Sequence, residues 1–121
     1  MPIATKYILI SRMDVDPEKE ALFNEVYESE HLPSVRKVPG VISATRLQSA
    51  PLTLSVGGEV RTVEAAGEPA FATLIEIESP DVLVSDGWAA AVEYGRWPGE
   101  VRPYTRNRRH TLHKVTDDGG T

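Results

Sequence analysis

The run from Ile3 to Met13 constrains the fold more than any other part of this 121-residue chain. The run is rich in β-branched and aromatic residues, and its centre, Tyr7-Ile-Leu-Ile10, is apolar at four consecutive positions. Successive side chains of a strand point to opposite faces of the sheet, so an unbroken apolar run indicates burial on both faces. The sequence therefore predicts a central strand over residues 3–13.

A helix is expected after this strand. Pro17 follows an acidic capping residue and precedes two glutamates, which is the pattern of a helix start. Apolar residues recur at helical spacing over 21–27, so one face of this helix can pack on a sheet. Pro33 is expected to end or bend the helix, because its ring clashes with the carbonyl four residues earlier. This places His31 in or just past the last turn.

Turn signals divide the rest of the chain into three strands and a second helix. The second helix is expected to open at Ser79-Pro80, to be irregular near Gly87 and to stop at Trp97-Pro98-Gly99. Further strands are expected over residues 41–47, 71–77 and 107–115, an exposed hairpin or loop insertion over 49–69, and a polar tail over 116–121.

The order of elements is β-α-β-β-α-β, which predicts one α+β domain over residues 1–121. This is the ferredoxin-like arrangement, an antiparallel sheet with two helices on one face. The other face of the sheet is left uncovered, although the strands at 3–13 and 71–77 carry apolar residues on both faces. A second copy related by a two-fold axis covers such a face most simply, so we expect a homodimer.

Composition excludes several classes of partner. A net charge of -5 argues against a protein that binds nucleic acid. The basic run at 106–110 does not change this, because strand alternation sends Arg106, Arg108 and His110 to one face and Asn107, Arg109 and Thr111 to the other. A strand edge or a dimer contact explains the run better. No apolar stretch is long enough to span a bilayer, and the lack of cysteine and of a leader-like N-terminus favours a cytoplasmic location.

No metal site is expected from the histidines of the last strand. His110 and His113 are three residues apart, so their side chains point to opposite faces of the sheet. The absence of cysteine also removes any thiolate ligand.

Two segments resemble the EthD-like branch of the dimeric α/β-barrel superfamily. They are Phe23-Asn-Glu-Val-Tyr27-Glu-Ser-Glu-His31-Leu-Pro33 and Val38-Pro-Gly-Val41, and the strand at 71–77 with the following Ser79-Pro80 also looks similar. The resemblance implies two ferredoxin-like units whose sheets close into one barrel. It also implies a pocket in each protomer between the sheet and its helices.

The resemblance leaves the chemistry open. Proteins of this fold include cofactor-independent monooxygenases, polyketide cyclases, lactone isomerases, decarboxylases and haem-degrading enzymes, so the fold alone does not assign a reaction. The chain lacks a clear Asn, Trp and axial His set in the order of the haem-degrading pattern. Haem is therefore disfavoured, and no cofactor is expected.

Tyr27 and His31 are the candidate catalytic residues. They are four residues apart, so both project from one face while the helix persists. His31 can act as an acid or base near neutral pH, and the helix dipole is expected to favour its protonated form; Tyr27 can orient a substrate oxygen. The structural alternatives are a histidine that caps carbonyls at the helix end and a tyrosine that packs beside Phe23 in the core.

Three further residues are candidates for substrate binding. Glu30 orients the histidine or a water, or is solvated surface. Arg46 binds a substrate carboxylate or forms an ion pair with Glu76 across the sheet, and the ion pair is the stronger expectation. Trp88, like Trp97, lines a pocket for a planar ligand or belongs to the core.

Two hypotheses for function follow. In the first, the chain is a cofactor-independent enzyme of isomerase, cyclase, decarboxylase or monooxygenase type, and His31 is its acid or base toward a small hydrophobic, oxygenated substrate. In the second, it is a non-catalytic homodimer that binds a small ligand or has an accessory role. The second predicts that His31 is buried against backbone carbonyls with no cavity beside it.

Overall fold

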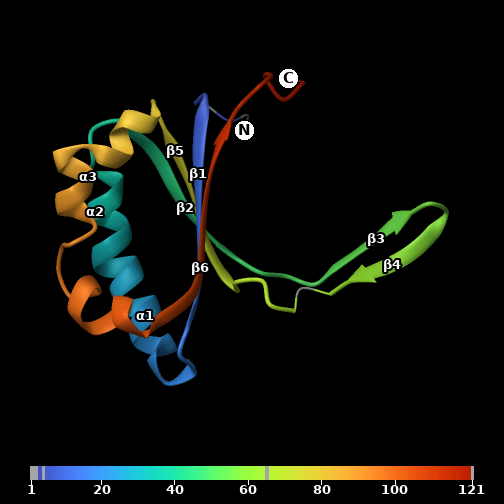
Figure 1. Ribbon diagram of the computed structural model, residues 1–121, viewed down its shortest axis with the longest axis horizontal. Coiled ribbons are helices and arrows are strands. Elements are labelled where there is room, and N and C mark those ends of the chain that lie inside the picture. The colour runs from blue at the N-terminus through green and yellow to red at the C-terminus, as the bar shows by residue number, and fades with distance from the viewer. Residues whose placement is uncertain (1–2, 4, 65, 121) are drawn as a thin grey trace.

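The computed structural model describes residues 3, 5–64 and 66–120. The predicted domain, first strand, insertion and tail include five residues outside this set, namely Met1, Pro2, Ala4, Ala65 and Thr121. An antiparallel four-stranded sheet has the order β2-β5-β1-β6, and helices cover one of its faces (Figure 1). The strands are β1 Tyr7–Val15, β2 Val41–Gln48, β5 Phe71–Ile77 and β6 Thr105–Lys114, and the helices are α1 Glu20–Val26, α2 Leu32–Arg36 and α3 Asp86–Ala91.

This arrangement confirms the predicted ferredoxin-like α+β fold. β1 lies between β5 and β6, in the interior of the sheet, as its apolar run indicates. None of the described helices is long and apolar enough to cross a membrane.

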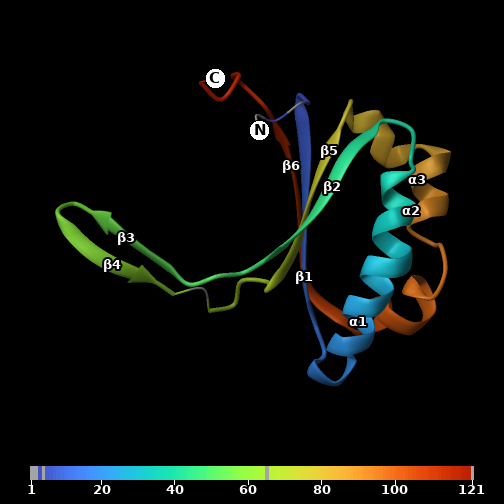
Figure 2. The ribbon, with the colours of Figure 1, turned by 180° about the vertical axis from the view of Figure 1, so that it is seen from behind.

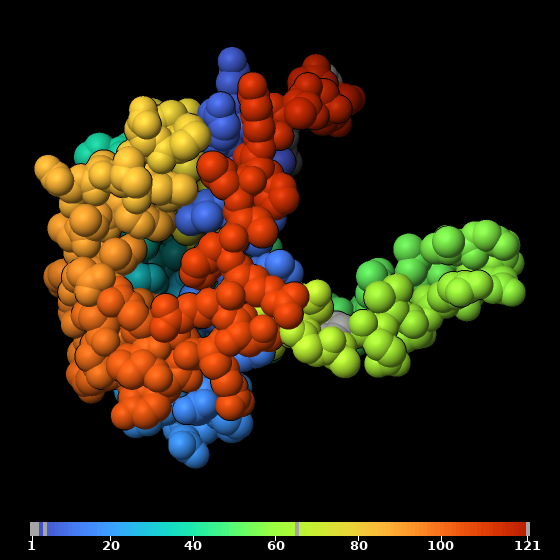
Figure 3. Space-filling model, viewed as in Figure 1, coloured from blue at the N-terminus to red at the C-terminus, as the bar shows by residue number. Residues whose placement is uncertain are grey.

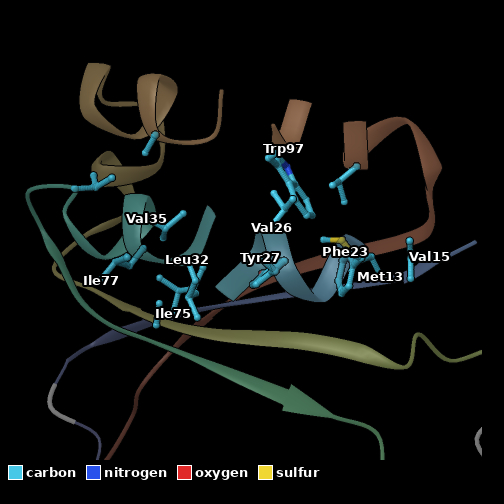
Figure 4. Close-up of a cluster of buried hydrophobic side chains, with 14 of the residues drawn as sticks. Met13, Val15, Phe23, Val26, Tyr27, Leu32, Val35, Ile75, Ile77 and Trp97 are labelled. Carbon is cyan, nitrogen blue, oxygen red and sulfur yellow. The ribbon is translucent and has the colours of Figure 1, made fainter. Parts of the chain in front are cut away.

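The core lies between the sheet and the helices. In β5, Thr73, Ile75 and Ile77 are buried on the helix side, and the residues between them are half-buried on the other face. Figure 4 shows how Trp97 reaches from the C-terminal half of the chain toward the helix that carries Tyr27. The core therefore joins the first and second halves of the chain.

Pro33 was expected to end or bend the first helix, and of these two outcomes the ending is wrong. A 3-10 turn over Pro17–Lys19 leads into α1, and a π-helical turn over Tyr27–His31 links α1 directly to α2. In this wider turn the Leu32 N–H donates to the carbonyl of Tyr27, five residues earlier. Pro33 then lies in the first turn of α2, where its missing N–H is tolerated. The helical segment ends at Arg36, and His31 is in its interior.

The second helix is broken into short pieces. A 3-10 turn over Pro80–Val84 is followed by Ser85 in extended conformation, and Ser85 then caps α3 by accepting the Trp88 N–H at 3.2 Å. After α3 the chain is irregular until a π-helical turn over Trp97–Val101. The break comes at Ser85, just before Gly87, because a serine cap starts a new helix there.

The insertion forms an arm that leaves the body of the molecule. β3, Leu52–Val56, pairs with β4, Glu59–Val63, and every residue of both strands is exposed. Figures 1 and 2 show that this arm projects on the side of the sheet opposite to the helices. Residues 116–120 of the tail are exposed as well.

Candidate functional site

A cavity of about 290 Å³ lies between the helix side of the sheet and the helices. Figure 3 shows a hollow between the orange segment that follows α3 and the red strand β6, with teal atoms of α2 at its base. The interior is largely apolar and is formed mainly by Leu9, Met13, Leu32, Val35, Ile75 and Leu83. Polar side chains enter this apolar space from the π-helical turn, from β5 and from β6.

His31 is the buried titratable group of this cavity. It is 8% exposed, and its ring stacks on Trp97 with centroids 4.1 Å apart and planes 17° apart. Its Nδ1 is buried and has no hydrogen-bond partner among the described residues. Buried polar atoms are nearly always paired, so the unpartnered nitrogen sets this histidine apart, and the residue lines the cavity.

Burial, and to a smaller extent the positive charge of Arg102, lower the pKa of His31 to about 4, while Glu93 opposes the change. His31 is therefore neutral at pH 7. The expectation that a helix C-terminus favours the protonated form is wrong, because the π-helical turn carries the helix past His31. A neutral imidazole is a proton acceptor, so the site holds a base rather than a cation.

Tyr27 lies beside His31, with ring centroids 5.1 Å apart. Its hydroxyl makes a short hydrogen bond with Thr73 Oγ1 of β5, and its ring also meets Trp97 at 5.3 Å. Burial raises the pKa of Tyr27, so the phenol stays neutral and keeps its proton for donation. The structure thus brings the two candidate catalytic residues together at one cavity.

Glu30 does not line this cavity. Its carboxylate accepts the backbone N–H of Arg96 at 2.9 Å and the Nε of the same residue at 2.7 Å. These bonds lower the pKa of Glu30. The side chain therefore ties the π-helical turn to the segment after α3 and is not in position to contact a ligand there.

Arg46 also lies outside the cavity. Its guanidinium binds Asn24 Oδ1 at 2.8 Å and Glu28 Oε1 at 3.0 Å, and it covers the outer face of the Tyr27 ring at 4.8 Å. The expected ion pair with Glu76 across the sheet is replaced by these contacts to α1 and the π-helical turn, because Arg46 faces the helices. Glu76 instead accepts a hydrogen bond from Ser43 at 2.7 Å.

Trp88 is the third candidate for ligand binding, and it does line the cavity. Trp97, which the sequence offers for the same role as Trp88, lines it too, and so do Arg102, Arg108 and His110, which were not candidates for ligand binding. Strand alternation placed Arg106, Arg108 and His110 on one face of the last strand, and this is wrong for Arg106, because an irregularity at Asn107 separates it from the other two. Nothing in the sequence showed that this face is the one turned to the helices.

No group of three or more metal-binding side chains gathers anywhere in the part of the chain that the structure describes.

Comparison with solved structures identifies the fold. An EthD family protein from Bacillus halodurans superposes with a TM-score of 0.57 at 16% identity, covering 92% of this chain and 99% of the other. The haem-degrading protein MhuD from Mycobacterium tuberculosis, solved with two haems in its active site, gives 0.61 at 14% identity, with 94% and 99% covered. For an antibiotic biosynthesis monooxygenase-like protein from Bacteroides thetaiotaomicron the values are 0.52 and 16%, with 93% and 90% covered.

No family model and no curated protein matches the sequence. At these identities the structural likeness concerns the fold, so chemistry has to be argued from the residues of the cavity. The resemblance to the EthD-like branch is confirmed at that level: the chain has the ferredoxin-like fold that EthD and antibiotic biosynthesis monooxygenase-type proteins share.

Proposed function

We propose that the cavity is the substrate site of a cofactor-independent enzyme in which neutral His31 is the general base. The observation that carries the proposal is the buried imidazole of His31, which lines an apolar cavity, is neutral, and has no described hydrogen-bond partner at Nδ1. A histidine that only capped the helix would have its nitrogens on backbone carbonyls, and none accepts from Nδ1 among the described residues.

The geometry supports removal of a proton next to a carbonyl group. The imidazole takes the proton, and the electron pair of the broken C–H bond moves onto the carbonyl oxygen to give an enolate. The ring of Tyr27 lies 5.1 Å from the imidazole and lines the same cavity, and its neutral hydroxyl can donate to that oxygen in place of its contact with Thr73. The apolar interior suits a small hydrophobic, oxygenated substrate.

Haem does not fit this site. The cavity of about 290 Å³ is at the lower end of the range for drug-sized ligands, and a porphyrin is a rigid disc of four pyrrole rings that needs more room. No step of the proposed reaction involves haem. The likeness to MhuD concerns the fold alone.

The test is hydrogen exchange into an enolisable bicyclic ketone. 2-Tetralone is incubated with the protein in D₂O, and deuterium incorporation is followed by NMR. We expect exchange to fall by about 100-fold or more in H31Q, because general base catalysis contributes this much. H113Q is the matched control, since His113 is exposed and outside the cavity. Y27F is expected to lower the rate less than H31Q.

The pH dependence of this exchange tests the same base. Because the pKa of His31 is about 4, the unprotonated form persists well below pH 6.5. The exchange rate is expected to fall on acidification with a midpoint near pH 4. Equal exchange by the wild type and H31Q would overturn the proposal, and tight binding of the ketone without exchange would favour the non-catalytic alternative.

We also propose that two copies pair through the uncovered face of the sheet. Ile10 of β1 and Leu74 of β5 are opposite each other on this face and half-buried, and Leu47 of β2 is 44% exposed. The arm projects on the same side, so a second copy seated there would lie beside it (Figure 2). Sedimentation at micromolar concentration is expected to give a dimer, and L74K a monomer. A monomeric wild type would refute this pairing.

A further inference from the structure

Two arginines, Arg102 and Arg108, line the cavity together with His110, and no described aspartate or glutamate lines it. The arginine charges also act on the two histidines. Burial is the main cause that lowers the pKa of His31 and of His110, and the charges of Arg102 and Arg108, respectively, add to it.

The two arginines differ in what neutralises them. Arg102 forms a bidentate pair with Glu93, with nitrogen to oxygen distances of 2.9 and 2.8 Å. Arg108 donates to the Thr105 hydroxyl at 3.0 Å and to the Arg102 carbonyl at 3.2 Å, and no described carboxylate pairs with it. Neutral oxygens orient a guanidinium without cancelling its charge. Arg108 therefore carries a net positive charge at the cavity.

The fold presents Arg108 to the cavity by an irregularity in β6. Asn107 has a φ of 51°, in the left-handed region, and the register of β6 against β1 shifts at this point, between Arg12 and Asp14. Arg106, before the irregularity, pairs with Asp16, whereas Arg108 and His110 after it line the cavity. A bulge often re-aims a side chain in this way next to a site.

Aromatic side chains also line the cavity. Trp97 and His31 form a stacked pair, and Trp88 lies at the same cavity. Flat aromatic surfaces pack best against a planar ring. We propose that the site takes a small planar acid, an aromatic or conjugated ring that carries the enolisable carbonyl group and also a carboxylate that binds the guanidinium of Arg108. This rests on the proposed function and names the class of its substrate.

Matched pairs of ligands test this inference. Benzoate and 2-naphthoate have almost the shapes of benzamide and 2-naphthamide and differ mainly in charge. Calorimetric titration is expected to show each acid binding about tenfold or more tightly than its amide, because charge-assisted bonds to a guanidinium are the strong ones. R108Q is expected to abolish this preference and R108K to keep part of it.

R109Q is the matched control. Arg109 is the next residue of the same strand, is exposed, and pairs with Glu68 at 3.4 Å outside the cavity. Retention of the preference in R109Q and its loss in R108Q would support the inference. Equal binding of acid and amide would overturn it while the exchange defect of H31Q still upheld the proposed function. Binding of neither pair at millimolar concentration would overturn it as well.

Discussion

The two β-α-β halves of this fold cover the sheet unequally. In the first half the helical segment is continuous from Pro17 to Arg36 and buries a row of side chains, Phe23, Val26, Tyr27, Leu32 and Val35. In the second half the helical pieces are short and separated, and β6 is exposed at every residue except its first, which is half-buried. The cavity lies where this second cover is incomplete. The well-packed helical cover therefore belongs to the first half, and the gap that forms the cavity belongs to the second. His31 lies in the first half and borders this gap.

Truncation of Phe23, in the better packed half, is expected to cause the largest loss of stability. Phe23 is 1% exposed, and its ring meets those of Tyr27, Phe71 and Trp97 at centroid distances of 5.3, 5.0 and 5.9 Å. F23A is expected to lower the free energy of unfolding by about 4 kcal/mol, as for other buried aromatic residues. Urea unfolding with an unchanged m-value measures this.

W88A is the matched change in the second half. Trp88 is half-buried and borders an existing cavity, so its side chain makes fewer packing contacts that the substitution could remove. We expect W88A to cost about half as much as F23A. Equal losses would show that the two halves contribute equally to the core.

The boundary between the halves is tested by the pH dependence of stability. The unfolded chain binds a proton at residue 31 below about pH 6.5, whereas the folded chain does so near pH 4, so the unfolded state binds more protons between these values. The free energy of unfolding therefore falls as the pH is lowered through this window, by about 3 kcal/mol from this group. H31Q should lack this part of the loss, and H113Q should retain it. Parallel pH curves for the wild type and H31Q would contradict the assignment.

Gly95 tests the link that holds the halves together. Its φ is +67°, and an added Cβ would lie 2.3 Å from Glu30 Oε1, which is bonded to Arg96. G95A is expected to lower the free energy of unfolding by about 2 kcal/mol, through backbone strain and displacement of Glu30. At Gly99, where an added Cβ meets nothing within 4 Å, G99A should have little effect. Thermal unfolding of both variants measures the difference. Similar losses of stability in G95A and G99A would show that the Glu30 contact does not contribute to stability.

The contrast between the halves also explains what the sequence could predict. Alternation in strands and helical spacing depend on local chain geometry, so the four strands of the sheet and the pairing of Tyr27 with His31 were accessible. The end of the first helix was predicted wrongly because a π-helical turn before Pro33 lets the helical segment continue past this proline. Tertiary packing, not the local sequence, decides whether such a turn forms.

The roles of the charged residues were predicted less well, for a related reason. Glu30 and Arg46 lie outside the cavity because they bind partners on other elements, Arg96 and Glu28, and no local sequence pattern encodes such partners. Arg108 was placed on the correct side relative to His110, but the face of an edge strand that turns inward depends on where the broken helix leaves space. The sequence therefore predicts the neighbouring pair Tyr27 and His31 better than the arginines that line the same cavity.

The smallest predicted effect concerns how the helical segments of the two halves begin. α3 starts at Ser85, whose hydroxyl accepts the Trp88 N–H at 3.2 Å, whereas Asp16, before the turn that leads into α1, makes no side-chain cap. S85A is expected to lower the free energy of unfolding by about 1 kcal/mol. D16A should cost less than about 0.5 kcal/mol, because it removes an ion pair with the largely exposed Arg106. Urea titrations of both variants measure the difference. A larger loss in D16A would mean that the first helical segment, despite its length, depends more on its start than the short α3 does.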